Sequence, residues 1–245
     1  SSAASDVYKR QFINRRNYFE FVNIKEVPSK DKPNYLDLEV EVEEKPTGYF
    51  SIQGGYSSVE ALLLGVQIQE NNLFGYGKSL GASVTVGTVS QNFLIDYFDP
   101  YFLDTSYQFG LQLFKREYQY IDYDRARWGG VLQFGKELNT WTFARLKYRF
   151  ESIKVDDLNS VATEVLQESK DKISSVTLGL TYDTRDNFMD PSKGISSSLY
   201  VQESNSYLGA NLHFTEYTAS FGKYYSFIPN HTLAFTADGL SLIHI

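Results

Sequence analysis

The stretches LLLGVQIQ (Leu62–Gln69) and LGASVTVG (Leu80–Gly87) decide the fold class of this chain. In both, every second side chain is apolar, and most of the positions between carry Gly, Ser, Thr or Gln. Successive side chains of a β-strand point to opposite faces, so this period of two predicts strands with one apolar and one polar face. The apolar face of the first stretch consists of Leu62, Leu64, Val66 and Ile68.

The same period recurs along most of the chain, with turn-forming residues between the segments. It predicts eleven strands in about 190 residues, which is typical of an all-β domain. Leu111, Leu113, Leu178 and Leu180 fall on the apolar faces of two later strands. The expected strands are Gly48–Tyr56, Leu62–Gln69, Leu80–Gly87, Asn92–Phe98, Tyr107–Leu113, Trp128–Lys136, Thr142–Phe150, Val176–Asp183, Ile195–Gln202, Asn211–Lys223 and His231–Ala237.

The composition excludes several classes of protein. The chain has 245 residues and a net charge of −7, which argues against a protein that neutralises nucleic-acid phosphates. It contains no Cys, so disulfides, thiolate nucleophiles and Cys-ligated metal sites are excluded. Its 19 Tyr and 18 Phe favour strands, because aromatic rings suit a pleated, half-buried surface.

Two architectures fit such strands, a soluble β-sandwich adhesin and a membrane barrel. The expected strands approach the length that crosses a bilayer when tilted, and their polar faces suit a wet lumen. Aromatic residues such as Trp141 and Phe143 cluster at strand ends, as in the girdles of membrane barrels. Connections also alternate between short ones (Asn139-Thr140) and long ones (Glu117–Arg127, Asp156–Lys172). These features favour a partial transmembrane antiparallel β-barrel with its apolar faces toward lipid.

The residues before the barrel differ in character. Residues 12–46 contain YLDLEVEVE (Tyr35–Glu43), which alternates between apolar and acidic residues and predicts a strand with one buried face. This segment is interpreted as the end of a small α+β module, with its boundary at Lys45-Pro46-Thr47-Gly48.

The chain contains five further motifs, namely NRRNYFEFVNI (Asn14–Ile24), EVEEKPTGYFSIQGGYSS (Glu41–Ser58), QENNLFGYGKSL (Gln69–Leu80), YFDPYF (Tyr97–Phe102) and DPSKG (Asp190–Gly194). Together these motifs resemble the BamA family of outer-membrane protein assembly factors. The resemblance implies POTRA modules followed by a sixteen-strand barrel. Residues 12–46 would then be the C-terminal part of the last POTRA module, and residues 47–239 would hold about eleven of the sixteen strands. It also implies turns at Gly75, Gly77, Pro100, Pro191 and Gly194.

The resemblance also implies a function, namely the folding and insertion of barrel proteins without enzymatic chemistry or a cofactor. The first strand would form a lateral seam with the last one and offer its edge to a client strand. The implied partners are the lipid bilayer, nascent outer-membrane proteins and accessory assembly lipoproteins, in the bacterial outer membrane with the POTRA part in the periplasm. An outer-membrane secretion pore or channel for a partner polypeptide is the alternative. The seam residues are Tyr49, Phe50, Ser51, Ile52, Gln53, Gly54, Gly55 and Tyr56.

Two clusters of charged residues have both a structural and a functional interpretation. Arg145, Lys147 and Arg149 alternate on one face and are interpreted as a lumen wall paired with Glu137 and Glu151, with an anion path as the alternative. The run Asp183–Asp186 is interpreted as a turn cluster at the periplasmic end. Catalysis would need an oriented nucleophile or base. The Gly-x-Ser-x-Gly pattern at Gly77–Gly81 joins two expected strands, not the strand and helix of a nucleophile elbow. We therefore expect no catalytic, metal or cofactor residues.

The two ends carry a signal at the codon level. SSAASDVYKRQ (Ser1–Gln11) resembles the translation of a transposase adapter used in preparing sequencing libraries. The codons GAT GTG TAT AAG AGA CAG for Asp6–Gln11 have a reverse complement that encodes LSLIHI, which is Leu240–Ile245. Residues 1–11 and 240–245 are therefore expected to be non-native scars, without specific packing, around a fragment of a longer reading frame.

Overall fold

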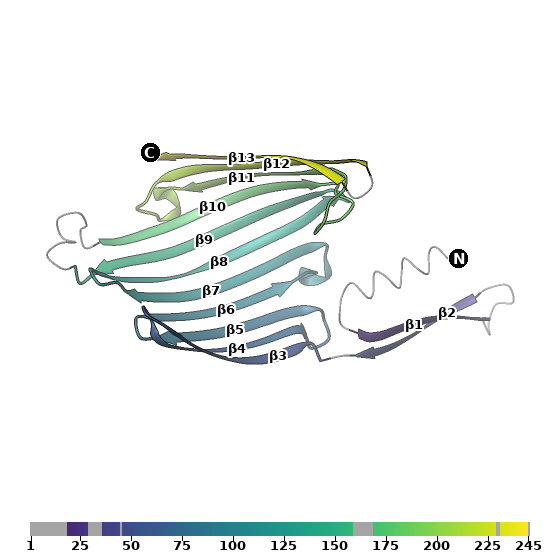
Figure 1. The fold of residues 1–245 in the computed structure, drawn as a ribbon, viewed down its shortest axis with the longest axis horizontal. Coiled ribbons are helices and arrows are strands. Elements are labelled where there is room, and N and C mark those ends of the chain that lie inside the picture. Colours follow the sequence, from purple (N-terminus) through teal and green to yellow (C-terminus); the bar gives the residue numbers. More distant parts are fainter. Residues whose placement is uncertain (1–18, 29–35, 45, 159–168, 229–230, 245) are drawn as a thin grey trace.

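The computed structural model describes residues 19–28, 36–44, 46–158, 169–228 and 231–244, which form two antiparallel sheets (Figure 1). In the small sheet, β1 (Phe19–Pro28) pairs with β2 (Leu36–Glu44). Eleven further strands form the large sheet, and two short 3₁₀ helices, η1 (Phe102–Asp104) and η3 (Ser206–Leu208), lie in its connections. Its strands are β3 (Gly48–Ser57), β4 (Ala61–Leu73), β5 (Lys78–Gly87), β6 (Ser90–Asp99), β7 (Tyr107–Gln119), β8 (Asp124–Asn139), β9 (Thr142–Asp156), β10 (Ser169–Asp183), β11 (Gly194–Ser204), β12 (Phe214–Ile228) and β13 (His231–His244).

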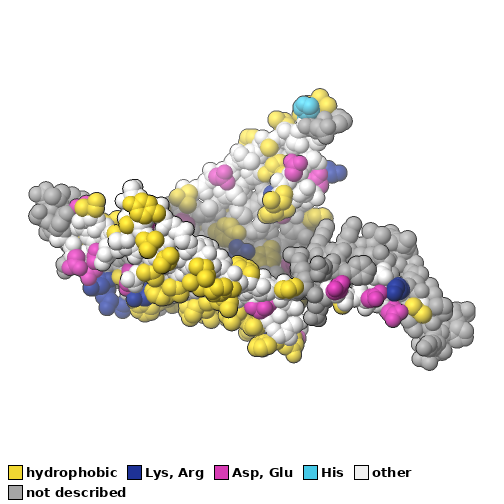
Figure 2. Space-filling model, turned by 60° about the horizontal axis from the view of Figure 1, so that its bottom comes forward, with side chains coloured by type: hydrophobic (Ala, Val, Ile, Leu, Met, Phe, Trp, Pro, Cys, Tyr) yellow, Lys and Arg dark blue, Asp and Glu magenta, His cyan; other side chains and the backbone are white. Residues whose placement is uncertain are grey.

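Every strand of the large sheet pairs with its neighbours in the sequence, so the order runs from β3 to β13 without a crossover. This is the meander of an up-and-down barrel. Figure 2 shows the sheet curving around a hollow, with apolar side chains gathered on its outer surface. The predicted all-β class and the predicted eleven strands are confirmed. A soluble sandwich needs two packed sheets, whereas the described residues provide one large sheet.

The register separates apolar and polar side chains onto the two faces. One row across β3–β6 consists of Ile52, Val66, Val84 and Phe93, and the next row, on the other face, begins with Ser51, Gln67 and Ser83. Among the described residues, only three hydrophobic side chains are buried, namely Phe114, Ile153 and Ala210. The apolar side chains therefore cover a surface instead of filling a core, and in a transmembrane barrel that surface contacts lipid.

Several strands are longer than the alternation of apolar residues predicts. Glu117–Arg127 was expected to be a long outer loop, but β7 continues to Gln119 and β8 begins at Asp124. Arg125 and Arg127 continue the alternation with charged side chains. A pattern based on alternating apolar residues does not detect this part of the strand. The connection from β9 to β10, residues 157–168, is long as expected.

The β1–β2 hairpin corrects one expectation. The strand predicted at Tyr35–Glu43 is present as β2, but Val40 and Val42, expected to be buried, are 47% and 42% exposed. Among the described residues this sheet has only two strands and nothing covers these side chains. Lys25 and Glu41 form an exposed ion pair across the hairpin, with 2.9 Å between Nζ and Oε2.

The C-terminal residues correct another expectation. Residues 240–244 were expected to pack against nothing, but they extend β13 along β12, with Leu240 opposite Thr218 and Leu242 opposite Glu216. The strand nevertheless changes character at this point. Up to Gly239, Leu233 and Phe235 lie on the apolar face of the sheet, whereas Leu240 and Leu242 lie on the polar face. An edge strand accepts such a segment because backbone pairing does not depend on side chains. Residues 1–11 lie outside the described residues.

Candidate functional site

Every predicted seam residue lies in β3, at one edge of the large sheet. Within the described residues it has one neighbour, β4, and together with β13 it forms the two edges of the sheet. Its register places Ser51 opposite Gln67 and Gln53 opposite Gly65. The other side of β3 presents the unpaired N–H and C=O groups of an edge strand, which can pair with another strand.

Side chains of β3 are more exposed than those of the strands behind it. Ile52 is 72% exposed, whereas Val66, opposite it in β4, is 44% exposed. Nine of the ten residues of β3 are exposed, and only Ser51 is half-buried. This exposure is that of an edge strand, and the described side chains of β13, at the other edge, are exposed as well.

The two glycines in β3 are not required by crowding. A Cβ atom added to Gly55 would meet no atom within 4 Å, and one added to Gly54 would meet only Leu64 Cδ2, at 3.8 Å. By contrast, a Cβ on Gly129 in β8 would collide with the carbonyl oxygen of Phe150. Gly54 and Gly55 thus leave two successive residues in the second half of β3 without side chains.

The beginning of β3 is fastened more firmly than its middle. Asn71 donates to the carbonyl oxygen of Thr47 through its backbone N–H (3.2 Å) and through Nδ2 (2.9 Å). The hydroxyl of Thr47 also donates to Glu70. At the next residue, the hydroxyl of Tyr49 accepts a hydrogen bond from Gln67 Nε2 of β4, at 3.1 Å. The strand is therefore anchored at its Gly48 end.

The residues predicted to face lipid lie together on the outer face. In β4 they are exposed and stand opposite apolar residues of β3 and β5, for example Leu64 opposite Val86. Leu111 is half-buried, because Tyr97 and Leu132 lie opposite it on both sides. The exposed members of the set are Leu62, Leu64, Val66, Ile68, Leu113, Leu178 and Leu180.

The predicted basic ladder lies on the opposite, inner face of β9. Glu151 is completely buried and pairs with Arg149, whose Nε donates to Oε2 at 2.9 Å, and with Arg127 of β8. Arg127 was missed from the sequence, because its partnership depends on the register between β8 and β9. Glu137, the other acid proposed for the wall, is exposed and forms no ion pair with the ladder among the described residues.

Turn residues predicted from the sequence occupy connections or strand ends at the end of the sheet where β3 begins. Gly75 (φ +80°) and Gly77 (φ +67°) lie between β4 and β5, and Gly194 (φ +114°) begins β11. Pro100 follows β6, and Pro191 lies between β10 and β11. Positive φ is the conformation that glycine adopts most easily.

The connection between β10 and β11 is held by hydrogen bonds to one side chain, Asp186. The carboxylate of Asp186 accepts backbone N–H bonds from Asn187 (3.0 Å), Ser192 (2.9 Å) and Lys193 (3.1 Å), and also a bond from the hydroxyl of Ser192. These hydrogen bonds, with that of the Ser192 hydroxyl the strongest, hold the pKa of Asp186 well below its usual range. The cluster therefore shapes a turn.

Other kinds of site receive no support in the described part of the chain. No group of three or more His, Cys, Asp or Glu residues there is placed to hold a metal ion. The described residues also include no helix that is long and apolar enough to span a membrane.

Comparison with protein families and curated proteins gives a consistent result. Residues 72–242 match the family described as the Omp85 superfamily domain. The chain is 27% identical over 191 residues to the outer membrane protein assembly factor BamA of Neorickettsia risticii, which covers 76% of this chain and 26% of that protein. It is 26% identical over 121 residues to BamA of Neisseria meningitidis serogroup B, which covers 48% of this chain and 15% of that protein.

Solved structures share the fold. A crystal structure of BamA from Haemophilus ducreyi lacking POTRA domains 1–3 matches with a TM-score of 0.71 at 18% identity, covering 99% of this chain and 50% of the other. CdiB from Acinetobacter baumannii matches with a TM-score of 0.58 at 13% identity, covering 96% of this chain and 46% of the other. The chain thus spans half or less of the length of each of these proteins.

Proposed function

Since this chain belongs to the Omp85 superfamily, we propose that it is part of an outer-membrane assembly factor that catalyses the folding and insertion of β-barrel proteins. The observation that carries the proposal is the pair of glycines in β3, Gly54 and Gly55, which no crowding requires and which leave the backbone of this strand uncovered. The curated relatives are named as assembly factors, which supports the same function.

The mechanism uses backbone pairing and no bond chemistry. In the full-length barrel, β3 pairs with the closing strand to form a seam. When the seam opens, the unpaired N–H and C=O groups of Phe50–Tyr56 template an incoming client strand by β-augmentation. The client's own hydrogen bonds and its burial in lipid supply the free energy, so no nucleotide is needed. The anchored Gly48 end keeps β3 attached to β4 while the middle of the strand exchanges partners.

The rest of the chain takes its place around this seam. Residues 12–46 are the C-terminal part of the last POTRA module and lie in the periplasm, next to the Gly48 end of β3. Residues 47–239 lie in the outer membrane. Nascent outer-membrane proteins are the clients, and accessory assembly lipoproteins bind the periplasmic part.

A second candidate function is an outer-membrane secretion pore for a partner polypeptide. The structural similarity to CdiB favours it, since 96% of this chain superposes on that protein. In such a pore the substrate passes through the lumen, along the wall of Arg145, Lys147 and Arg149, and β3 need not open. The two functions therefore differ in whether locking β3 blocks activity.

A crosslink across the seam separates them. In the full-length protein, Gln53→Cys is combined with a cysteine in the strand that pairs with β3, and client insertion into vesicles is measured before and after reduction. Locking the seam should stop insertion while the barrel stays folded, and reduction should restore it.

A crosslink on the other side of β3 provides a matched control. A Cβ at Gly65 would lie 3.6 Å from the Cβ of Gln53, within the disulfide range of about 3.5–4.5 Å. The pair Gln53→Cys with Gly65→Cys fixes β3 to β4, which the mechanism keeps together, so insertion should continue. Normal insertion with a locked seam would contradict the assembly function.

A further inference from the structure

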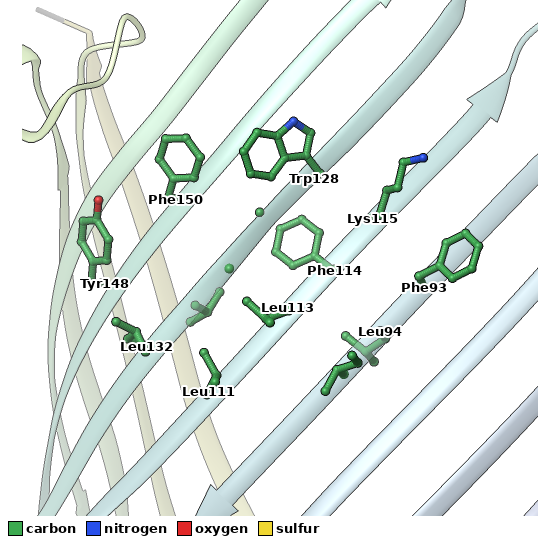
Figure 3. Close-up of a pocket in the computed structure, with 14 residues that line it drawn as sticks. Phe93, Leu94, Leu111, Leu113, Phe114, Lys115, Trp128, Leu132, Tyr148 and Phe150 are labelled. Atoms are coloured by element: carbon green, nitrogen blue, oxygen red, sulfur yellow. The ribbon is translucent and has the colours of Figure 1, made fainter.

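A groove interrupts the apolar outer face of the sheet between β6 and β9 (Figure 3). It has a volume of about 710 Å³, and its walls are apolar. Trp128 and Phe150 form one side, with their rings edge to face and 5.6 Å between centroids. Leu111 and Leu113 of β7 lie along another side, and Leu132 and Tyr148 continue the row of Leu111 across β8 and β9.

The groove exists because Gly130 occupies an outward position in β8. Gly130 lies opposite Leu113 in β7 and Phe150 in β9. A Cβ atom at this position would lie 3.0 Å from Leu113 Cδ2 and 3.3 Å from the carbonyl oxygen of Gln112. Any larger side chain would therefore fill the space. The floor of the groove is bare backbone, while its neighbours carry some of the largest side chains on this face.

One end of the groove is basic. Lys115, which lines the groove, lies directly opposite Trp128, and the same row continues through Ser152 to Lys172. The next row outward contains Glu117, Lys154 and Lys170. These two rows carry four lysines against one glutamate, in a chain whose net charge is −7. The ammonium groups of Lys170 and Lys172 form no ion pair within the described residues, whereas Lys115 pairs with Glu117 at 2.7 Å and Lys154 pairs with Asp156.

We propose that this groove is a binding site for an anionic, phosphate-bearing lipid. One acyl chain lies in the groove over Gly130, and the phosphate lies at the level of Lys115 and Lys172. The distance along β7 from Lys115 to Leu111 is about 13 Å, enough to hold much of an extended acyl chain. The apolar walls and the basic end match the two halves of such a lipid, and the membrane supplies it at high concentration. The site depends on the membrane-spanning fold and not on the seam.

The two tryptophans of the chain allow a direct test. Trp128 lines the groove, whereas Trp141 lies in the connection between β8 and β9, at the other end of the sheet, and is similarly exposed. The full-length protein is placed in phosphatidylcholine vesicles that contain the same fraction of either brominated phosphatidylglycerol or brominated phosphatidylcholine. Brominated chains quench tryptophan fluorescence on contact. The signal of each tryptophan is the difference between the parent protein and its Trp→Phe variant.

Trp128 should be quenched several-fold more by the anionic lipid than by the zwitterionic one, and Trp141 should show no such preference. Lys115→Gln combined with Lys172→Gln should abolish the preference, since each lysine near a charged headgroup changes local lipid binding by roughly fivefold. Lys136→Gln, at the opposite end of β8, is the matched control and should leave it unchanged. Gly130→Leu should reduce quenching of Trp128 by both lipids. Equal preferences at the two tryptophans, or a preference that survives the double lysine change, would overturn the proposal.

Discussion

Glu151 is completely buried in the inner wall of the sheet and is held by Arg127 from the neighbouring strand. Arg149 pairs with the other carboxylate oxygen, so one carboxylate bridges two guanidinium groups. Because Glu151 lies at the junction of β8 and β9, the network connects two strands in the middle of the sheet.

Glu151→Ala should therefore destabilise the barrel strongly. Removing one partner of a buried ion pair costs about 3 kcal/mol, since the remaining charge keeps its desolvation penalty. Glu137→Ala, which removes an exposed acid of the same wall, should change stability by less than about 0.5 kcal/mol. Urea unfolding of the full-length protein in lipid measures both. Equal losses of unfolding free energy in the two variants would show that the buried ion pairs of Glu151 add no stability to the barrel.

A charged side chain should cost more stability on the outer face of the sheet than on the inner face. Leu178→Arg, on the exposed outer face, should cost about 2–4 kcal/mol of barrel stability near the middle of the bilayer. Gln112→Arg should cost much less, because it places the guanidinium on the inner face, opposite Asp96. Thr177 is a poorer inner-face control, since it is only 6% exposed and lies opposite Lys147. Equal costs on both faces would contradict the assignment of the lipid-facing side.

Much of this fold could be predicted from the sequence because barrel strands alternate visibly. Leu62–Gln69 and Leu80–Gly87 both lie within observed strands, and all eleven predicted strands are present. The ends of strands were harder to predict, since charged residues such as Lys115 and Glu117 take the place of apolar ones on the outer face of β7. The partnership of Arg127 with Glu151 and the groove at Gly130 could not be predicted, because both depend on register, which alternation alone does not specify.

The turn between β10 and β11 should be sensitive to acid through Asp186. Its pKa is lowered in the folded state, first by the Ser192 hydroxyl and then by backbone N–H groups. The stabilisation is therefore fully present above the ordinary Asp pKa of about 3.9 and is lost as the pH falls below it. Cleavage by pepsin next to the exposed Phe188 should accelerate below about pH 4 in the parent protein. In Asp186→Ala, cleavage should be fast already at higher pH. If cleavage of the parent protein depends on pH in the same way, the Asp186 hydrogen bonds do not stabilise the turn.

The reversal of polarity in β13 yields a prediction about residues 240–245, which we propose are not native. Leu240 and Leu242 place apolar side chains on the inner face, next to Thr218 and Glu216. Leu240→Thr with Leu242→Thr should therefore be neutral or stabilising, unlike an apolar-to-polar change at Leu233 on the outer face. Sequencing the unbroken gene should reveal, after Gly239, residues that keep polar side chains at the even-numbered positions. A native Leu-Ser-Leu at this place would disprove the proposal.

Replacing the two glycines of β3 should raise the stability of the barrel and lower the rate of client insertion. Gly54→Ala and Gly55→Ala have room for the added methyl group, and neither glycine adopts a positive φ. Alanine reduces the conformational freedom of the unfolded strand, so each change should stabilise the barrel by about 0.4–1 kcal/mol. If β3 exchanges partners during insertion, a better ordered strand should open less often. The double alanine variant should then insert clients more slowly and unfold at a higher urea concentration.

Gly129→Ala is the matched comparison. Its Cβ would collide with the Phe150 carbonyl oxygen, so this change should destabilise the barrel. Urea titration and client insertion into vesicles measure the two quantities in parallel. A double variant that is more stable and inserts clients at the parent rate would separate the stability of β3 from insertion and contradict the seam mechanism.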